Sequence, residues 1–108
     1  MSSFATLEIQ YTGGADPIDF GEIYDQAKKV VTEQGYHTDV LASLRDAFDE
    51  GRADVSITAG GLRGLVTDIA ALCPEAQFEV RACGEDIRDT WVAAFEQGAP
   101  VFDEGPWD

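Results

Sequence analysis

The most constraining feature of this sequence is a repeated alternation of apolar and polar residues with a period of two. It occurs over residues 5–11, 54–59 and 77–83. Such alternation is typical of a strand that has one buried face and one face in water. A further strand is predicted over residues 90–95, then a turn and a short edge pairing at Val101 and Phe102. Strands of this kind fold into a sheet with one covered face.

Three segments instead carry apolar residues at steps of three and four, which predicts helices. The first helix is predicted over residues 16–35, with Asp16 as its cap. The second is predicted over residues 39–51, with Asp39 as its cap, and the third over residues 62–74. Because the helices and strands are intermixed without a repeat or a linker, the chain is predicted to be one α+β domain, residues 1–108. We expect a mainly antiparallel sheet of about four strands with helices on one face.

The C-terminal part of the chain contains a run of motifs over residues 72–80, 84–86, 89–92 and 95–98. These motifs resemble the C-terminal part of small uncharacterised ferredoxin-like proteins that are encoded on plasmids, phages and bacterial genomes. The resemblance covers about a third of the chain. It implies a variant of the ferredoxin-like fold and no particular chemistry.

The charge of the chain is strongly unbalanced. Twenty-one Asp and Glu against seven Lys and Arg give a net charge of −14. Residues 16–50 and residues 84–108 each carry a net charge of −6. Direct binding to nucleic acid or to an anionic membrane surface is therefore disfavoured, since both need basic residues. Without a signal peptide or an apolar run long enough to span a membrane, the protein is expected to be cytoplasmic.

Catalytic and metal-binding motifs are weak in this sequence. His37 is the only histidine, and it falls in a polar segment between two predicted helices, where a catalytic triad is not expected. The acidic pairs match no calcium-loop pattern. Residues 60–64 form a glycine-rich connection that we interpret as a tight turn and not as a phosphate site. Cys73 and Cys83 are predicted to be free thiols. We therefore expect no enzyme activity, cofactor or metal.

The spacing of the acids suggests a partner. Asp16, Asp19, Glu22 and Asp25 occupy every third position, which in a helix separates them by about 4.5 Å along the axis. Duplex DNA carries one charge per about 3.4 Å of each strand, so such a winding row could imitate its charge density. Two alternatives stay open: the helix dipole favours acids near a helix start, and a salt-adapted proteome has acidic surfaces throughout.

The predicted function is therefore that of an inhibitor without enzyme activity. Its acidic surface would occupy the basic groove of a nucleic-acid-handling defence complex such as a CRISPR effector. In size and charge the chain resembles phage-encoded anti-defence proteins, including anti-CRISPR and antirestriction DNA mimics, whose location would be the host cytoplasm. The alternatives are an immunity protein against a basic toxin nuclease, a salt-adapted domain, and a small-ligand-binding protein. Trp91, Phe102 and Trp107 lie beside acids, as at binding surfaces, although Trp91 and Phe102 could equally belong to the core. The residues predicted to contact the partner are Asp16, Asp19, Glu22, Asp25, Asp46, Asp49, Glu50, Asp103, Glu104, Trp107 and Asp108.

Overall fold

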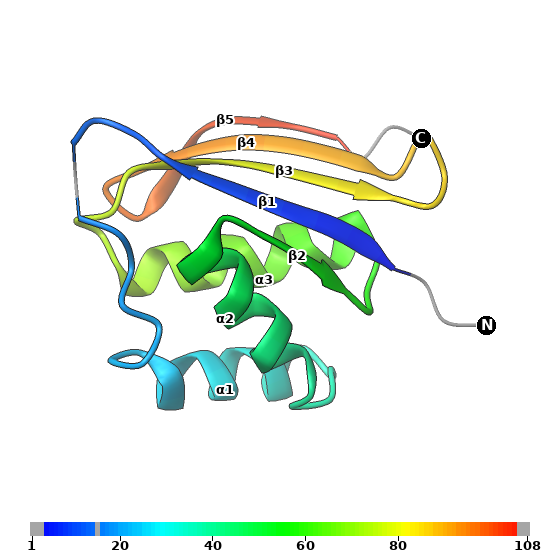
Figure 1. Ribbon diagram of the computed structural model, residues 1–108, viewed down its shortest axis with the longest axis horizontal. Helices are drawn as coiled ribbons and strands as arrows, with labels where there is room; N and C mark the ends of the chain where they lie inside the picture. The colour runs from blue at the N-terminus through cyan, green and yellow to red at the C-terminus, as the bar shows by residue number, and fades with distance from the viewer. Residues whose placement is uncertain (1–3, 15, 106–108) are drawn as a thin grey trace.

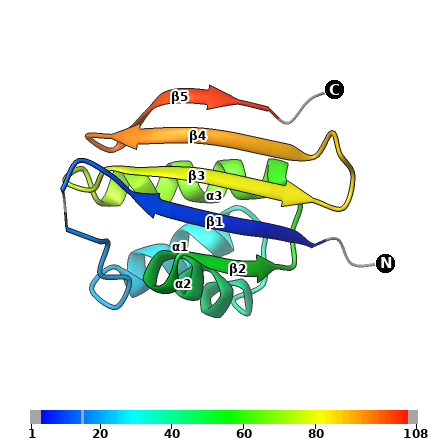
Figure 2. The same cartoon turned by 45° about the horizontal axis from the view of Figure 1, so that its top comes forward.

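Five antiparallel strands form one sheet in the order β2-β1-β3-β4-β5 (Figures 1 and 2). The structure is a computed structural model that describes residues 4–14 and 16–105. The expected mainly antiparallel sheet is confirmed, with one strand more than the approximate number predicted. The strands are β1 (Ala5–Tyr11), β2 (Arg52–Val55), β3 (Phe78–Gly84), β4 (Thr90–Glu96) and β5 (Ala99–Glu104).

Three helices cover one face of this sheet, which confirms the predicted α+β architecture. They are α1 (Tyr24–Glu33), α2 (Val40–Glu50) and α3 (Ala59–Leu72). All three lie on the same side of the sheet in Figure 1, with α3 beneath the central strands and α1 farthest from the sheet. Within residues 4–14 and 16–105, no helix covers the opposite face of the sheet, so every second residue of each strand is open to solvent on that side.

An aromatic chain joins the helical layer to the sheet. Phe20 stacks on Phe48 of α2, with ring centroids 5.8 Å apart, and Phe48 meets Phe78 of β3 edge to face at the same distance. Phe78 stacks on Phe95 of β4 at 5.1 Å, and Phe95 meets Trp91 at 6.1 Å. All five side chains are buried, and no polar or charged residue in the described ranges is buried with them. Burial of these five aromatic side chains stabilises the packing of the helices against the sheet.

The strand predicted over residues 54–59 is wrong in position. β2 ends at Val55, and Ala59 already belongs to α3. The hydroxyl of Thr58 accepts a hydrogen bond from the Gly61 N–H and caps this helix, so the chain turns away from the sheet at that point. Ile57 and Ala59 are buried as predicted, but outside the sheet.

The bounds of α2 agree with the prediction, although its cap does not. Gly51 ends the helix in the left-handed region at φ 94°, a conformation that glycine adopts without strain. At the other end Asp39 has helical backbone angles and makes no capping hydrogen bond. Its carboxylate lies 3.3 Å from Nδ1 of His37 instead. Both side chains are largely exposed.

Candidate acidic binding surface

The segment that leads into α1 carries three of the predicted partner-contacting acids, and it is not helical. The helix predicted from residue 16 begins only at Tyr24. Ile18 and Phe20, two positions apart, are both buried, and the Glu22 N–H donates to the Asp19 carbonyl at 3.1 Å in a turn that precedes the helix. The carboxylate of Asp19 accepts a hydrogen bond from the Gly21 N–H at 3.1 Å. Such a local bond competes with helix formation, and the predicted winding row of carboxylates is therefore wrong.

These acids instead border a groove together with a distant part of the chain. Asp16, Asp19 and Glu22 face Glu75, which lies in the connection between α3 and β3. The groove has a volume of about 770 Å³, and none of the described residues that line it is a lysine or arginine. Its apolar lining includes Pro17, Ile18, Ile23, Leu72 and Pro74. We call this feature, four carboxylates above an apolar floor, the acidic groove. Glu75 was missed by sequence reasoning, because only the fold brings it to residues 16–22.

Cys73 also lines the acidic groove. Partial burial raises the pKa of its thiol, and the negative charge of Glu22 adds to the effect. Both causes favour the neutral thiol, so this cysteine is not an activated nucleophile. It contributes an uncharged surface to the groove floor.

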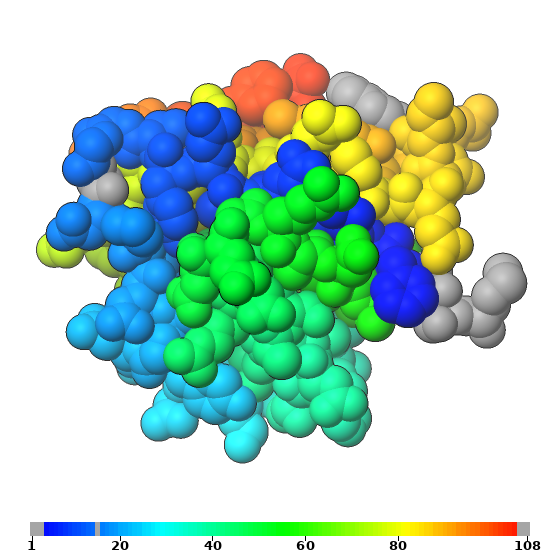
Figure 3. All heavy atoms as spheres, in the orientation of Figure 1, coloured from blue at the N-terminus to red at the C-terminus, as the bar shows by residue number. Residues whose placement is uncertain are grey.

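Tyr11, the last residue of β1, contacts the C-terminal part of α2. Its hydroxyl donates a hydrogen bond to the Phe48 carbonyl at 2.8 Å. Burial raises the pKa of Tyr11 to about 12, against an opposing hydrogen bond with the Ile18 backbone, and the charge of Asp49 raises it further. Figure 3 shows segment 16–23 and α2 on the same surface of the molecule.

The predicted acids on the helices differ in their surroundings. Asp49 forms an ion pair with Arg45 one turn earlier, with Nε and Oδ2 3.4 Å apart. Asp46 and Glu50 are exposed on α2 without an ion pair. Asp25 lies in the first turn of α1, where the helix dipole favours an acid, and the two lysines of the chain follow at residues 28 and 29. The surface of α1 is consequently of mixed charge.

Asp103, one of the residues predicted to contact the partner, has a structural role. Its carboxylate accepts hydrogen bonds from Arg63 of α3 at 2.9 and 3.2 Å and from the Trp91 indole N–H at 2.7 Å. The Arg63 guanidinium lowers the pKa of this carboxyl, with a smaller contribution from Trp91. Trp91 is fully buried, which confirms the core alternative for this residue, whereas Phe102 is exposed. Glu104 is exposed, and Trp107 and Asp108 lie outside the described residues.

The glycine-rich connection at residues 60–64 is part of α3. The carboxylate of Asp89 accepts hydrogen bonds from the N–H groups of Ala59 and Gly60, at 3.0 and 3.3 Å. A negative group of the chain itself thus occupies the position where a helix start would bind an anion. Two of the glycines have a separate reason, because a Cβ at Gly61 would collide with the Tyr36 hydroxyl and one at Gly64 would crowd the Gln34 side chain.

Three further observations bear on function. In the described ranges, no three His, Cys, Asp or Glu side chains come together in a way that could hold a metal ion. None of the helices there has the length and apolar character needed to cross a membrane. Comparisons with protein-family models, with curated proteins and with solved structures found no match.

Proposed function

We propose that this protein is an inhibitor without enzyme activity that binds a basic, nucleic-acid-binding surface of another protein through its acidic groove. By occupying that surface it would exclude DNA or RNA. A CRISPR effector or another nucleic-acid-handling defence complex has the required chemistry, and the host cytoplasm would be the place of action.

One observation carries the proposal: the negative charge is almost uncompensated. All 21 acids except Asp108 lie in the described ranges, and only Asp49 and Asp103 form an ion pair with an arginine there. If the acids served only to keep the surface hydrated, no region of the surface would need to be free of basic residues. The acidic groove, in contrast, gathers carboxylates from two distant segments and has no basic residue in its lining.

The composition of the groove matches basic side chains. Lysine and arginine have an apolar stem and a charged head, so the stem can contact an apolar floor while the head meets the carboxylates. Carboxylates in this position also occupy the place that phosphates would take on a basic partner. Attraction between the −14 chain and such a partner should accelerate binding and weaken as salt screens it over about 8 Å at physiological ionic strength.

The test is capture of partners from a host lysate on the immobilised full chain at low and at high salt. We expect a basic nucleic-acid-binding protein to be retained at low salt and to be released by added duplex DNA. The groove variant E22Q/E75Q should bind that protein about tenfold more weakly, if each lost contact contributes roughly 0.7 kcal/mol. The matched variant E33Q/E85Q removes the same charge outside the groove and should retain most of the binding.

Equal loss of binding in both variants would show that net charge and not the groove is responsible. Retention of no basic protein at low salt would refute the proposed function and favour a salt-adapted surface. In both variants the amides replace carboxylates of the same shape at exposed positions, so the fold should be unaffected.

A further inference from the structure

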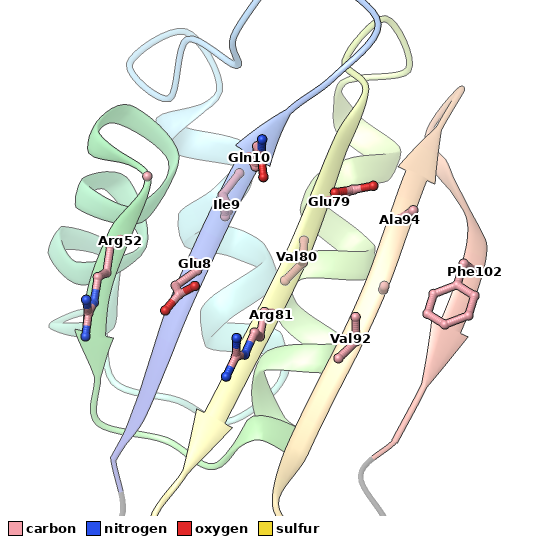
Figure 4. Close-up of a pocket in the computed structure, with 12 residues that line it drawn as sticks. Glu8, Ile9, Gln10, Arg52, Glu79, Val80, Arg81, Val92, Ala94 and Phe102 are labelled. Carbon is pink, nitrogen blue, oxygen red and sulfur yellow. The ribbon is translucent and has the colours of Figure 1, made fainter.

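The face of the sheet opposite the helices has a defined order of side chains. The register places Arg52, Glu8, Arg81, Val92 and Glu104 in one row across all five strands. Figure 4 shows the side chains of this face, with the helices behind the strands. The polar half of the row, on β2, β1 and β3, alternates in sign, because Glu8 lies between two arginines. Opposite charges on neighbouring strands attract each other, so this half is electrostatically balanced.

The other half of the face is apolar. Ala94 lies opposite Phe102 across β4 and β5, and Val92 follows on the same side of β4. Val92 is 38% exposed and Phe102 46% exposed, although both are large apolar residues. We call Val92, Ala94 and Phe102 the apolar strip. Figure 4 shows all three on the open side of the sheet.

Carboxylates surround the apolar strip. Glu79 of β3 lies opposite Ala94, Glu104 of β5 lies opposite Val92, and Glu96 follows at the end of β4. In the described part of the chain, none of these three acids forms an ion pair. Arg81 is the one cation placed directly beside the strip by the register of these strands. An occupant of the strip therefore meets an apolar surface bordered by three carboxylates and one arginine.

The shape of this region limits the occupant. The face is hollowed by about 780 Å³ across the whole sheet, from Arg52 of β2 to Phe102 of β5. Adjacent strands lie about 4.8 Å apart, so β3 and β5 are separated by about 10 Å, which is the diameter of an α-helix with its side chains. A second copy of the chain would bring two hollowed faces together and would add another net charge of −14. Both effects oppose a dimer through this face.

We propose that the apolar strip binds a basic amphipathic helix of a partner protein. The helix lies over β3, β4 and β5 and turns apolar residues at i, i+3, i+4 and i+7 towards Val92, Ala94 and Phe102. Lysine or arginine on its flanks meets Glu79, Glu96 and Glu104. The sheet then has helices on both faces, as in three-layer proteins. This inference does not depend on the acidic groove, which lies elsewhere on the chain.

The probe is a 21-residue peptide of leucine and lysine. Leucine occupies the positions i, i+3, i+4 and i+7 in a pattern repeated along the peptide, so that a helix of this sequence has one apolar and one basic face. A peptide of the same composition in scrambled order serves as its control. Both are titrated into the isotope-labelled full chain, and amide shifts are followed by NMR. We expect the amphipathic peptide alone to shift residues 79–81, 92–96 and 101–104.

Three variants sharpen the test. F102S and the isosteric pair E79Q/E104Q should each weaken binding of the amphipathic peptide about tenfold, since both act at or beside the strip. I87S removes an apolar side chain that is 89% exposed in the connection between β3 and β4, and it should change the affinity less than twofold. Circular dichroism checks that each variant is folded.

Several results would overturn the inference. One is equal binding of the two peptides, and another is a set of shifts confined to the acidic groove; the second would still support the proposed function. Unchanged affinity in both F102S and E79Q/E104Q would also contradict it. Sedimentation of the wild-type chain as a dimer that F102S dissociates would show that a second copy occupies the strip. Conversely, binding that survives in E22Q/E75Q supports the strip even if the groove has no partner.

Discussion

Removal of the Asp103 side chain tests the contact that holds the edge strand β5 against the rest of the fold. Asp103 accepts the indole N–H of Trp91 at 2.7 Å, and Trp91 is fully buried. In Asp103→Ala this N–H loses its acceptor. A buried donor without a partner costs about 1–3 kcal/mol, so the free energy of unfolding should fall by about 2 kcal/mol. Asp103→Asn should cost less, because its amide oxygen can still accept the indole N–H.

Urea unfolding followed by far-ultraviolet circular dichroism measures this difference. For a slope of about 1.5 kcal/mol per M, a loss of about 2 kcal/mol lowers the midpoint by more than 1 M. The matched control is Glu104→Gln, on the next residue of the same strand, which should change the free energy of unfolding by less than about 0.5 kcal/mol. If Asp103→Ala is no more destabilising than Asp103→Asn, the indole hydrogen bond is not what stabilises this edge.

Three further predictions concern pH and helix capping. Arg63 lowers the pKa of Asp103 below its ordinary 3.8. The difference in the free energy of unfolding between the wild type and Asp103→Asn should therefore be constant above about pH 5 and decrease as the pH falls through the folded-state pKa. Parallel acid titrations of both proteins check this. Asp89→Ala should lower the free energy of unfolding by about 1–2 kcal/mol, since Ala59 and Gly60 lose their acceptor at the start of α3, whereas Glu85→Gln should not; urea unfolding compares them. Because the pKa of Tyr11 is raised to about 12, stability should fall between pH 10 and 12, and Tyr11→Phe should remove that fall in unfolding measured across this range.

The strands with a clear period of two were predictable from sequence alone. Residues 5–11 and 78–82 alternate because each strand buries one face against the helices, and the burial of Leu7, Ile9 and Val80 follows that pattern. The strand over residues 54–59 shows the same alternation, yet only its first part is a strand. Ile57 and Ala59 are buried at the same spacing for another reason. Ile57 lies in a bend, and Ala59 is the first residue of α3. Alternation identifies burial, and it does not identify the partner that causes it.

The failure of the first predicted helix has a similar origin. Apolar residues at three- and four-residue steps run from Phe20 to Val31, and the helical part of that run starts at Tyr24. The preceding residues follow the same steps but are fixed by the burial of Ile18 and by the local hydrogen bond of Asp19. The periodicity shows neither of these contacts. It also does not show that Phe20 packs on Phe48, which is 28 residues away.

The position of a charge along the chain and its position on the surface are therefore separate questions. Sequence counts placed six excess negative charges in residues 16–50 and six in residues 84–108, and the fold gives the acids of these groups different roles. Asp89 caps α3 and Asp103 holds β5, so these two acids complete the fold. Glu75, in contrast, belonged to neither group and joins Asp16, Asp19 and Glu22 through the path of the chain. An acid that is neutralised by an arginine of its own chain, as Asp103 is by Arg63, is poorly suited to recruit a basic partner. The carboxylates with the strongest case for recognition are consequently those that the fold brings together without supplying a cation.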